Sequence, residues 1–511
     1  MNNVTFLSRF LLITFTALIL LTSRAQANDS TGQASSETNK PIPALVEFIS
    51  SHKGKFNDVK VDYEVIAAET ALTNDKGDVT GHLFSTSYLR TNVKKGVSRP
   101  VAFVFNGGPG SSSMWLHMGL LGPKVVKVVS DASEDDGAAP YVLQDNPQTL
   151  LDKVDLVFID PIGTGYSRLV GNGKPEDYWG LKADTTSIAE FIRIWITKHK
   201  RWNDAKYLIG ESYGSPRAVG VAKALRSNGI DIALNGIVMI SQAMDYTGST
   251  PVDDNLLAFV TFFPTLSAIA HYHGKAGQGE PLEAFLDRSR AFAVDEYLPA
   301  LFKGNLLTTQ QKQQIAQKMS AFIGLDTDYI LRSDLRVLTS RFAKALLRDE
   351  GKTVGFLDGR YTQQEVDQVA GRPMSDAASQ SISSAYAVAI NEYMQNDLQV
   401  KLQRPYYLSS SEVSEHWDWS AIEPNVFDEP EYVKVARILS KEMRKNSDLK
   451  LLVASGYYDM ITPFFDAEYT LARHGFQRSK ITMTYYEGGH MMYVNQDAFS
   501  QLLMDMRAFI Q

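Results

Sequence analysis

The sequence predicts an α/β fold in which helices flank a mostly parallel central sheet and a further helical region is inserted. Two patterns support this prediction. Short apolar runs end in glycine-rich or polar turns, and helical patterns lie between several of these runs. Residues 246–430 break that rhythm, because helical patterns dominate there and strand signals are few.

Six apolar runs have the character of strands buried on both faces. They lie at residues 101–105, 155–159, 207–209, 237–240, 449–454 and 481–485. Strands covered on both faces show continuous rather than alternating hydrophobicity, as in parallel sheets. Helical patterns at 187–197 and 218–226 lie between such runs. We therefore expect functional residues at the carboxyl ends of these strands.

The remaining segments define the expected domain organisation. Alternating residues at 61–69 and 81–89, with a turn signal between them, predict an opening hairpin or meander. We expect a catalytic core from residues 42–245 and 431–511, and a helical cap over the active site from residues 246–430. Within the expected cap, helical patterns lie at 309–322 and 333–347, and a further helical pattern at 431–445 leads into the run at 449–454.

The first 27 residues have the features of a signal peptide. Arg9 supplies positive charge, residues 10–21 are mostly apolar, and Ala25-Gln26-Ala27 is a small-x-small cleavage site. An uncleaved anchor is the alternative, but the run is short for a membrane span. Residues 28–41 are polar and predict a disordered tether. We expect an exported protein, periplasmic or secreted, with no stable membrane association after cleavage.

Composition excludes several classes of function. The 511 residues carry a net charge of −7, and no basic stripe stands out, so we expect no nucleic-acid partner. The chain has no cysteine, which excludes a cysteine nucleophile and a thiolate zinc site. No H-E-x-x-H motif is present. We expect neither a metal nor a cofactor, and no feature of the sequence bears on the oligomeric state.

Gly210-Glu211-Ser212-Tyr213-Gly214 matches the G-x-S-x-G pattern of a nucleophile elbow. An apolar strand pattern precedes it and an alanine- and valine-rich helix follows, which is the context that this motif requires. A serine on such a strained turn projects its hydroxyl above the sheet. The motif predicts an α/β-hydrolase fold with Ser212 as the nucleophile, and an ordinary glycine-bounded turn is the alternative.

A nucleophilic serine needs a general base and an acid that orients this base. In this fold the acid follows the serine in the sequence and the histidine comes last. Asp459 follows the run at 449–454, and His490 follows the run at 481–485. Either residue alone could belong to an ordinary turn. Three residues in the right order, each after a strand end, predict the triad Ser212, Asp459 and His490.

Five ordered motifs resemble those of the serine carboxypeptidases, peptidase family S10. They are Asn106 to Ser113 (NGGPGSSS), Gly163 to Ser167 (GTGYS), Gly210 to Gly214 (GESYG), Gly456 to Ile461 (GYYDMI) and Gly489 to Met491 (GHM). The resemblance covers residues 60–245 and 430–511, whereas the helical middle matches in position rather than in motif. It implies an α/β-hydrolase core with a helical cap, and removal of the C-terminal residue from peptide substrates.

The resemblance also implies roles for residues beside the triad. The backbone N–H groups of Gly108 and Tyr213 would form the oxyanion hole, where one lost donor typically costs about 3 kcal/mol. Asn106, the Gly107 N–H and Glu211 would bind the terminal carboxylate of the substrate. Two carboxylates in contact cannot both stay ionised, so Glu211 would have to be protonated. Activity is then expected to favour acidic pH.

Two positions depart from the family pattern. Leu120 stands where the family has a second glutamate, and Ser111 stands where it has a cysteine. The first hypothesis is an exported serine carboxypeptidase. The second, which Leu120 supports, is a serine esterase or acyltransferase with the same machinery. The third is a non-catalytic binding protein on a hydrolase scaffold, which the intact triad disfavours.

Overall fold

The structure is a computed structural model that describes residues 41–510 apart from 95, 129–131, 133–135, 228, 230, 421 and 423–432. The predicted signal peptide (1–27) and all but the last residue of the predicted tether (28–41) lie outside the described residues. Among the helices of the described chain, none is both long enough and apolar enough to cross a membrane.

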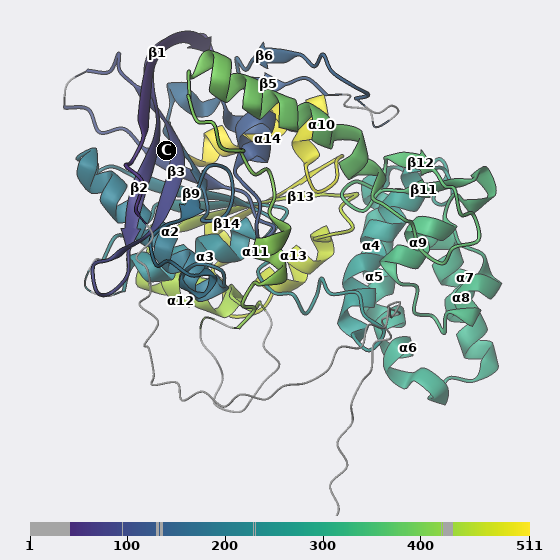
Figure 1. Ribbon diagram of the computed structural model, residues 1–511. Helices are drawn as coiled ribbons and strands as arrows, with labels where there is room; N and C mark the ends of the chain where they lie inside the picture. The colour runs from purple at the N-terminus through teal and green to yellow at the C-terminus, as the bar shows by residue number, and fades with distance from the viewer. Residues whose placement is uncertain are drawn as a thin grey trace, which may run out of the picture. The chain divides into compact units, whose positions relative to one another are not determined.

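A ten-stranded sheet forms the centre of the described chain (Figure 1). Its order is β1-β2-β3-β7-β4-β9-β10-β13-β14, with β8 paired to β3. The strands are β1 (Glu47–Phe56), β2 (Val59–Thr73), β3 (Val79–Arg90), β4 (Val101–Phe105), β7 (Asp155–Asp160), β8 (Arg168–Leu169), β9 (Lys206–Glu211), β10 (Gly236–Ile240), β13 (Lys450–Gly456) and β14 (Ile481–Tyr486). Neighbours from β7 to β14 pair in parallel. The predicted mostly parallel central sheet is confirmed.

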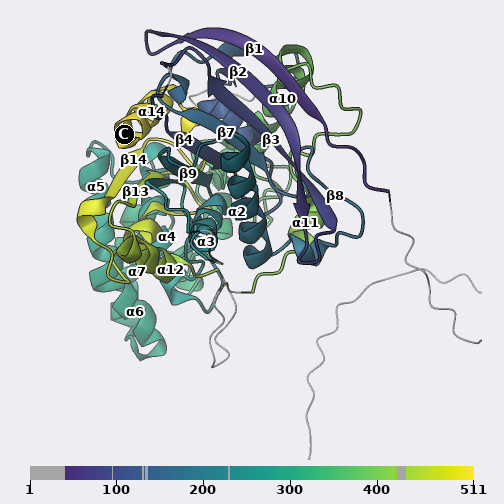
Figure 2. The same cartoon turned by 90° about the vertical axis from the view of Figure 1, so that its left-hand side faces the viewer.

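Helices cover both faces of this sheet. In β4, Phe103 and Phe105 pack into one hydrophobic cluster, whereas Ala102 and Val104 pack into another. The first cluster includes α2 (Leu181–Lys198), α3 (Gly214–Leu225) and α12 (Ala436–Lys445), and the second includes α10 (Ala377–Glu392) and α14 (Gln496–Phe509). Figure 2 shows α2 and α3 lying over the sheet. Burial on both faces explains the apolar runs of β4, β7, β9, β10 and β13. The prediction is wrong for the run at 481–485, because β14 lies at the edge of the sheet and most of its residues are half-buried or exposed.

The inserted region has two parts. The first, which we call the insertion lobe, has its own hydrophobic cluster and is drawn in teal and green in Figure 1. It contains α4 (Leu256–Tyr272), α5 (Leu282–Phe292), α6 (Leu298–Lys303), α7 (Thr309–Ile323), α8 (Thr327–Arg332), α9 (Thr339–Ala345), β11 (Lys352–Val354) and β12 (Thr362–Gln364). In the second part, α10 packs with the residues of the sheet. The domain boundaries at 246 and 430 stay a prediction.

Smaller elements complete the described chain. They are α1 (Met114–Leu116), β5 (Lys124–Val126), β6 (Leu143–Asp145), α11 (Ser411–Glu415) and α13 (Phe464–Leu471). The helix expected at 333–347 is wrong in its first part, because Asp334 and Leu335 have left-handed backbone, with φ values of 52° and 63°. The opening hairpin, β2 with β3, is antiparallel as predicted, and β1 adds a strand that was not predicted.

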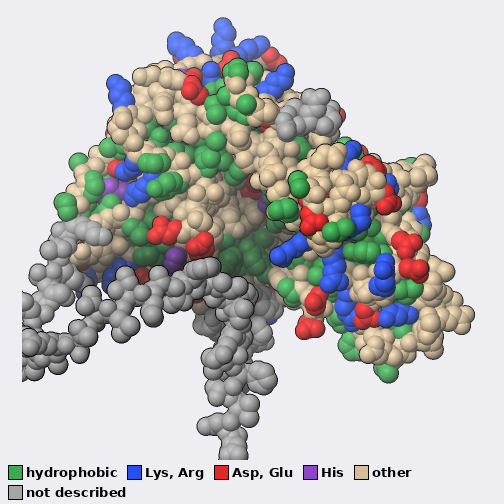
Figure 3. Space-filling view, turned by 45° about the vertical axis from the view of Figure 1, so that its right-hand side comes forward, with side chains coloured by type: hydrophobic (Ala, Val, Ile, Leu, Met, Phe, Trp, Pro, Cys, Tyr) green, Lys and Arg blue, Asp and Glu red, His purple; other side chains and the backbone are tan. Residues whose placement is uncertain are grey.

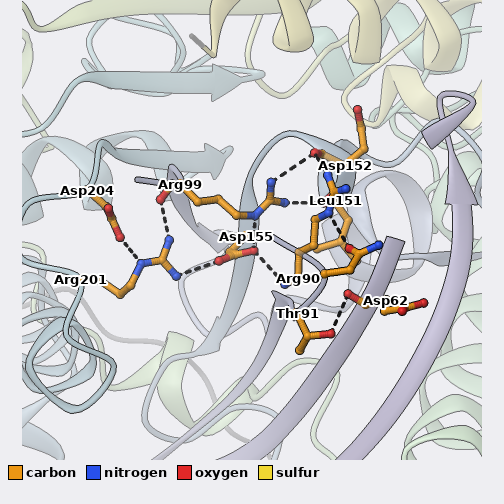
Figure 4. A network of polar contacts seen from close by, with 10 residues as sticks. Asp62, Arg90, Thr91, Arg99, Leu151, Asp152, Asp155, Arg201 and Asp204 are labelled. Carbon is orange, nitrogen blue, oxygen red and sulfur yellow. Dashed lines mark hydrogen bonds and ion pairs between the residues drawn. The ribbon is translucent and has the colours of Figure 1, made fainter. Parts of the chain in front are cut away.

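A network of ion pairs lies at the amino ends of the parallel strands. Asp155, the first residue of β7, accepts from Arg99 at 2.6 Å and from Arg201 at 2.7 Å. Figure 4 shows both guanidinium groups pointing toward this carboxylate. Arg90 N–H also donates to it at 3.0 Å. The network therefore joins the segments that precede β4, β7 and β9.

Candidate active site

Ser212 lies on the turn between β9 and α3. Its backbone is left-handed, with φ 58°, a conformation that non-glycine residues adopt only where the surroundings impose it. A Cβ on Gly210 would stand 2.3 Å from the carbonyl oxygen of Gly214, so this turn leaves no room for a side chain there. Ser212 itself is partly exposed. The predicted nucleophile therefore sits on a strained turn with access to solvent.

Asp459 and His490 form a buried pair. His490 Nδ1 lies 2.8 Å from Asp459 Oδ2, and the two residues are 5% and 0% exposed. The backbone N–H groups of Ile461 and Thr462 donate to Asp459 Oδ1, and the Thr462 hydroxyl donates to Oδ2. Burial, the largest single influence, lowers the pKa of His490, but the charge and hydrogen bond of Asp459 together with the charges of Glu211 and Asp376 outweigh it, and the pKa is raised above its ordinary value.

The end of β10 connects Ser212 to this pair. Ser212 N–H donates to the Ile240 carbonyl oxygen at 2.9 Å. The next residue, Ser241, donates its hydroxyl to the His490 carbonyl oxygen at 2.7 Å. The structure thus brings Asp459 and His490 into direct contact. Ile240 and Ser241, at the end of β10, link this pair to the turn that carries Ser212.

The residues expected to form the oxyanion hole come from the ends of β4 and β9. Gly107 packs tightly on the nucleophile turn, because a Cβ on it would lie 2.5 Å from the Tyr213 backbone nitrogen. Gly108 is exposed and has φ 103°, a conformation that favours glycine. Among the described residues, neither the Gly108 N–H nor the Tyr213 N–H donates to another group. Both donors are therefore available to an anion.

Arg217, which the sequence did not single out, contacts both segments that carry the expected oxyanion donors. Its side chain is fully buried, and Nε donates to Asp184 at 2.7 Å. The same guanidinium donates to the Asn106 carbonyl oxygen and lies over the Tyr213 ring at 5.1 Å. One ion pair between α2 and α3 therefore anchors both segments of the expected oxyanion hole.

Glu211 is buried directly beside the nucleophile. Its Oε2 accepts from the Tyr493 hydroxyl at 2.8 Å, and the Asn106 side chain is a second hydrogen-bond partner. Asn106 Oδ1 is occupied by the Leu116 N–H, so the amide N–H of Asn106 faces Glu211. Burial raises the pKa of Glu211 to about 7. This carboxyl group therefore binds a proton near neutral pH.

Position 120, where the family has a second glutamate, holds a leucine and therefore no carboxyl group. It is fully buried in the π-helical turn His117–Leu121. The partner of Glu211 is instead the phenol of Tyr493, which the sequence analysis missed. Tyr493 follows His490 by three residues in the same segment, and this proximity was the available signal.

A hollow separates the insertion lobe from the sheet-bearing part of the described chain, with hydrophobic side chains in its depth (Figure 3).

Among the described residues, no three or more histidine, aspartate or glutamate side chains gather as metal ligands do.

Comparisons with known proteins agree on one family. The family model for serine carboxypeptidase matches residues 76–503. Serine carboxypeptidase-like 36 of Arabidopsis thaliana is 30% identical over 158 residues, which cover 30% of this chain and 30% of that relative.

The fold has a counterpart among solved structures. KEX1(delta)P, a prohormone-processing carboxypeptidase from Saccharomyces cerevisiae, is similar with a TM-score of 0.53 and 14% identity, over 87% of this chain and 91% of the other. A carboxyl esterase from Bacillus coagulans has a TM-score of 0.33 and 12% identity, over 86% and 97% of the two chains. The predicted α/β-hydrolase fold is confirmed.

Proposed function

The chain belongs to the serine carboxypeptidase family, and from this premise we propose that it releases the C-terminal residue of peptides. The observation that carries the proposal is the 2.8 Å contact between Asp459 and His490 beside the strained turn of Ser212. A serine, a histidine and an orienting acid in this relation form the machinery of acyl transfer.

In the proposed reaction Ser212 Oγ adds to the carbonyl carbon of the last peptide bond, and its proton passes to His490 Nε2. Asp459 keeps the imidazole oriented and stabilises its charged form. The N–H groups of Gly108 and Tyr213 hold the oxyanion. His490 returns the proton to the departing amine as the C–N bond breaks. Water then repeats the sequence on the acyl-enzyme and restores the serine.

Recognition of the free C-terminus is proposed for Asn106, Gly107 and Glu211. A neutral Glu211 can donate a hydrogen bond to the substrate carboxylate, whereas an ionised Glu211 repels it. The raised pKa of Glu211, about 7, supports this role, because the acid then carries its proton in mildly acidic solution. Binding is expected to weaken as pH rises through 7.

Release of amino acids from N-blocked dipeptides tests the proposal. The assay compares free-acid dipeptides with their C-terminal amides from about pH 4 to pH 8, alongside a Ser212→Ala variant. We expect release that requires Ser212 and strongly prefers the free acid. Equal cleavage of amides would contradict carboxylate recognition.

An esterase or acyltransferase is the second candidate, because Leu120 leaves Glu211 without a second carboxyl group. Ser212-dependent cleavage of the matching esters, with no release from peptides, would establish this alternative. Absence of any reaction of Ser212 with a phosphonate would favour the non-catalytic binding protein.

Export completes the proposal. We propose that residues 1–27 are removed and that the mature protein is periplasmic or secreted. N-terminal sequencing of the protein from periplasmic and culture fractions tests this, with a mature chain that begins at Asn28 as the expected result. A chain that still begins at Met1 would contradict it.

A further inference from the structure

One segment of the insertion lobe that contacts the predicted triad is the loop of residues 355–361, which joins β11 to β12 and which we call the cap loop. Two backbone hydrogen bonds from it bracket the acid of the triad. Gly359 N–H donates to the Tyr458 carbonyl oxygen at 2.9 Å, and Met460 N–H donates to the Phe356 carbonyl oxygen at 3.0 Å. Tyr458 and Met460 also belong to the hydrophobic cluster of the lobe. The acid is therefore held between two residues that the lobe contacts.

The cap loop holds the base of the triad as well. His490 N–H donates to the Leu357 carbonyl oxygen, and Gly489 N–H donates to the Asp358 carboxylate at 2.9 Å. The approach is close, because a Cβ on Gly489 would lie 2.2 Å from the Leu357 oxygen. The cap loop thus fixes the turn from which the imidazole projects.

Asp358 is itself held rigidly by Arg360. Nε of Arg360 lies 3.0 Å from Oδ1 and Nη2 lies 2.6 Å from Oδ2. Only 4% of the Arg360 side chain and 7% of the Asp358 side chain are exposed. The guanidinium also lies over the Tyr458 ring at 5.4 Å. Since bidentate pairs fix direction as well as distance, the oxygen that accepts from Gly489 has little freedom.

We propose that Asp358 is a positioning residue for catalysis. Through Asp358, the insertion lobe contributes to the geometry of the active site. This rests on the role proposed above for His490. Through Gly489, Asp358 orients the imidazole toward Ser212, and Arg360 fixes Asp358. Without the acceptor, a buried N–H loses its partner and the turn relaxes. A displacement of about 1 Å at a catalytic group can lower a rate about 100-fold.

Two substitutions at Asp358 test the proposal. Asp358→Ala removes the acceptor, and we expect kcat on a simple ester, and the rate at which a fluorophosphonate labels Ser212, to fall about 10- to 100-fold. KM is expected to change little, because no substrate contact is lost. Asp358→Asn keeps one acceptor oxygen and is expected to recover most of the rate. Neither assay needs a peptide, so a failed carboxypeptidase proposal leaves this test intact.

Glu365→Gln is the matched control, because the Lys344–Glu365 pair, 2.9 Å apart, is equally buried in the same lobe. It is expected to lower the melting temperature and leave kcat and labelling unchanged. If Asp358→Ala does not fold, Arg360→Lys decides, since it keeps the charge but loses the fork, and a fall of about threefold to tenfold is expected. Wild-type labelling rates in Asp358→Ala or Arg360→Lys, or an equal loss in Glu365→Gln, would overturn the proposal.

Discussion

The two ends of the parallel strands hold buried carboxyl groups in different surroundings. At the amino ends, Asp155 lies between two guanidinium groups, those of Arg99 and Arg201 (Figure 4). At the carboxyl ends, Glu211 is equally buried, but its hydrogen bonds come from a phenol and an amide, those of Tyr493 and Asn106. The first carboxylate is in contact with two cations, whereas these hydrogen-bond partners of the second are neutral and His490 acts on it only through space.

This difference decides what each carboxyl group can do. Burial penalises a charge, and a cation in contact offsets that penalty, so a paired carboxylate can serve as a structural link. A carboxyl group without such a cation responds by binding a proton at higher pH, and burial raises the pKa of Glu211 to about 7. Protonation near neutral pH agrees with the anion recognition proposed for Glu211, whereas we expect the amino-end network to contribute stability.

The largest effect is expected at the carboxyl ends of the strands, from replacing Ser212, the predicted nucleophile. Ser212→Ala is expected to lower kcat about a million-fold, the scale observed when a serine hydrolase loses its nucleophile. The melting temperature is expected to stay near that of the wild type, because a partly exposed hydroxyl is removed. Steady-state kinetics and calorimetry measure both. A loss below about a thousandfold would point to another nucleophile, since one oxyanion donor alone reaches that scale.

The opposite behaviour is expected at the amino ends. Asp155→Ala leaves the buried guanidinium of Arg99 without its carboxylate, whereas Arg201 keeps its second partner, Asp204. Loss of the buried pair is expected to destabilise the fold by roughly 3–5 kcal/mol. The folded fraction is expected to keep the wild-type kcat. Denaturation curves measure the stability, and Glu47→Ala, which breaks the exposed pair with Lys198, is the control, with a loss below about 1 kcal/mol. Equal stability of the two variants would refute the assigned structural role.

The sequence predicted the parallel strands well and the first strand not at all. The strands β4 and β10 are apolar throughout, and β7 is apolar between the aspartates at its two ends, because helices cover both faces of the sheet. β1 escaped prediction because its residues alternate between exposed and half-buried positions and include Ser50, His52 and Lys53. The helix expected at 333–347 failed at its start because Asp334 and Leu335 have left-handed backbone there.

The candidate site also contains residues that the sequence predicted and residues that it did not. Ser212, Asp459 and His490 each follow an apolar run, so chain order alone predicted where they lie relative to the sheet. Partners from distant segments left no local pattern. Tyr493 and Glu211 are 282 residues apart, and Asp358 is 131 residues from Gly489. Only the folded chain brings such groups together, and the roles of all these residues stay predictions.

Removing the titration of Glu211 should change how binding depends on pH. In the wild type, KM for free-acid peptides is expected to rise as pH increases through about 7, because Glu211 loses its proton. Glu211→Gln cannot ionise, and its amide N–H can still donate to the substrate carboxylate. We therefore expect a KM that is nearly constant from about pH 6 to pH 8. A KM that still rises in Glu211→Gln would assign the titration to another group.

The smallest expected effect separates the phenol from the carboxyl group. The Tyr493 hydroxyl donates to Glu211 and thereby favours its ionised form, which lowers the pKa of Glu211 against the larger effect of burial. Tyr493→Phe removes this donor, so the pKa of Glu211 is expected to rise further. The pH at which KM increases should then move upward by about one unit, the equivalent of one hydrogen bond to a charged group. The control is the C-terminal amide, which has no carboxylate and should show no such shift. A midpoint that stays in place, or moves to lower pH, would mean that the phenol does not stabilise the ionised form of Glu211.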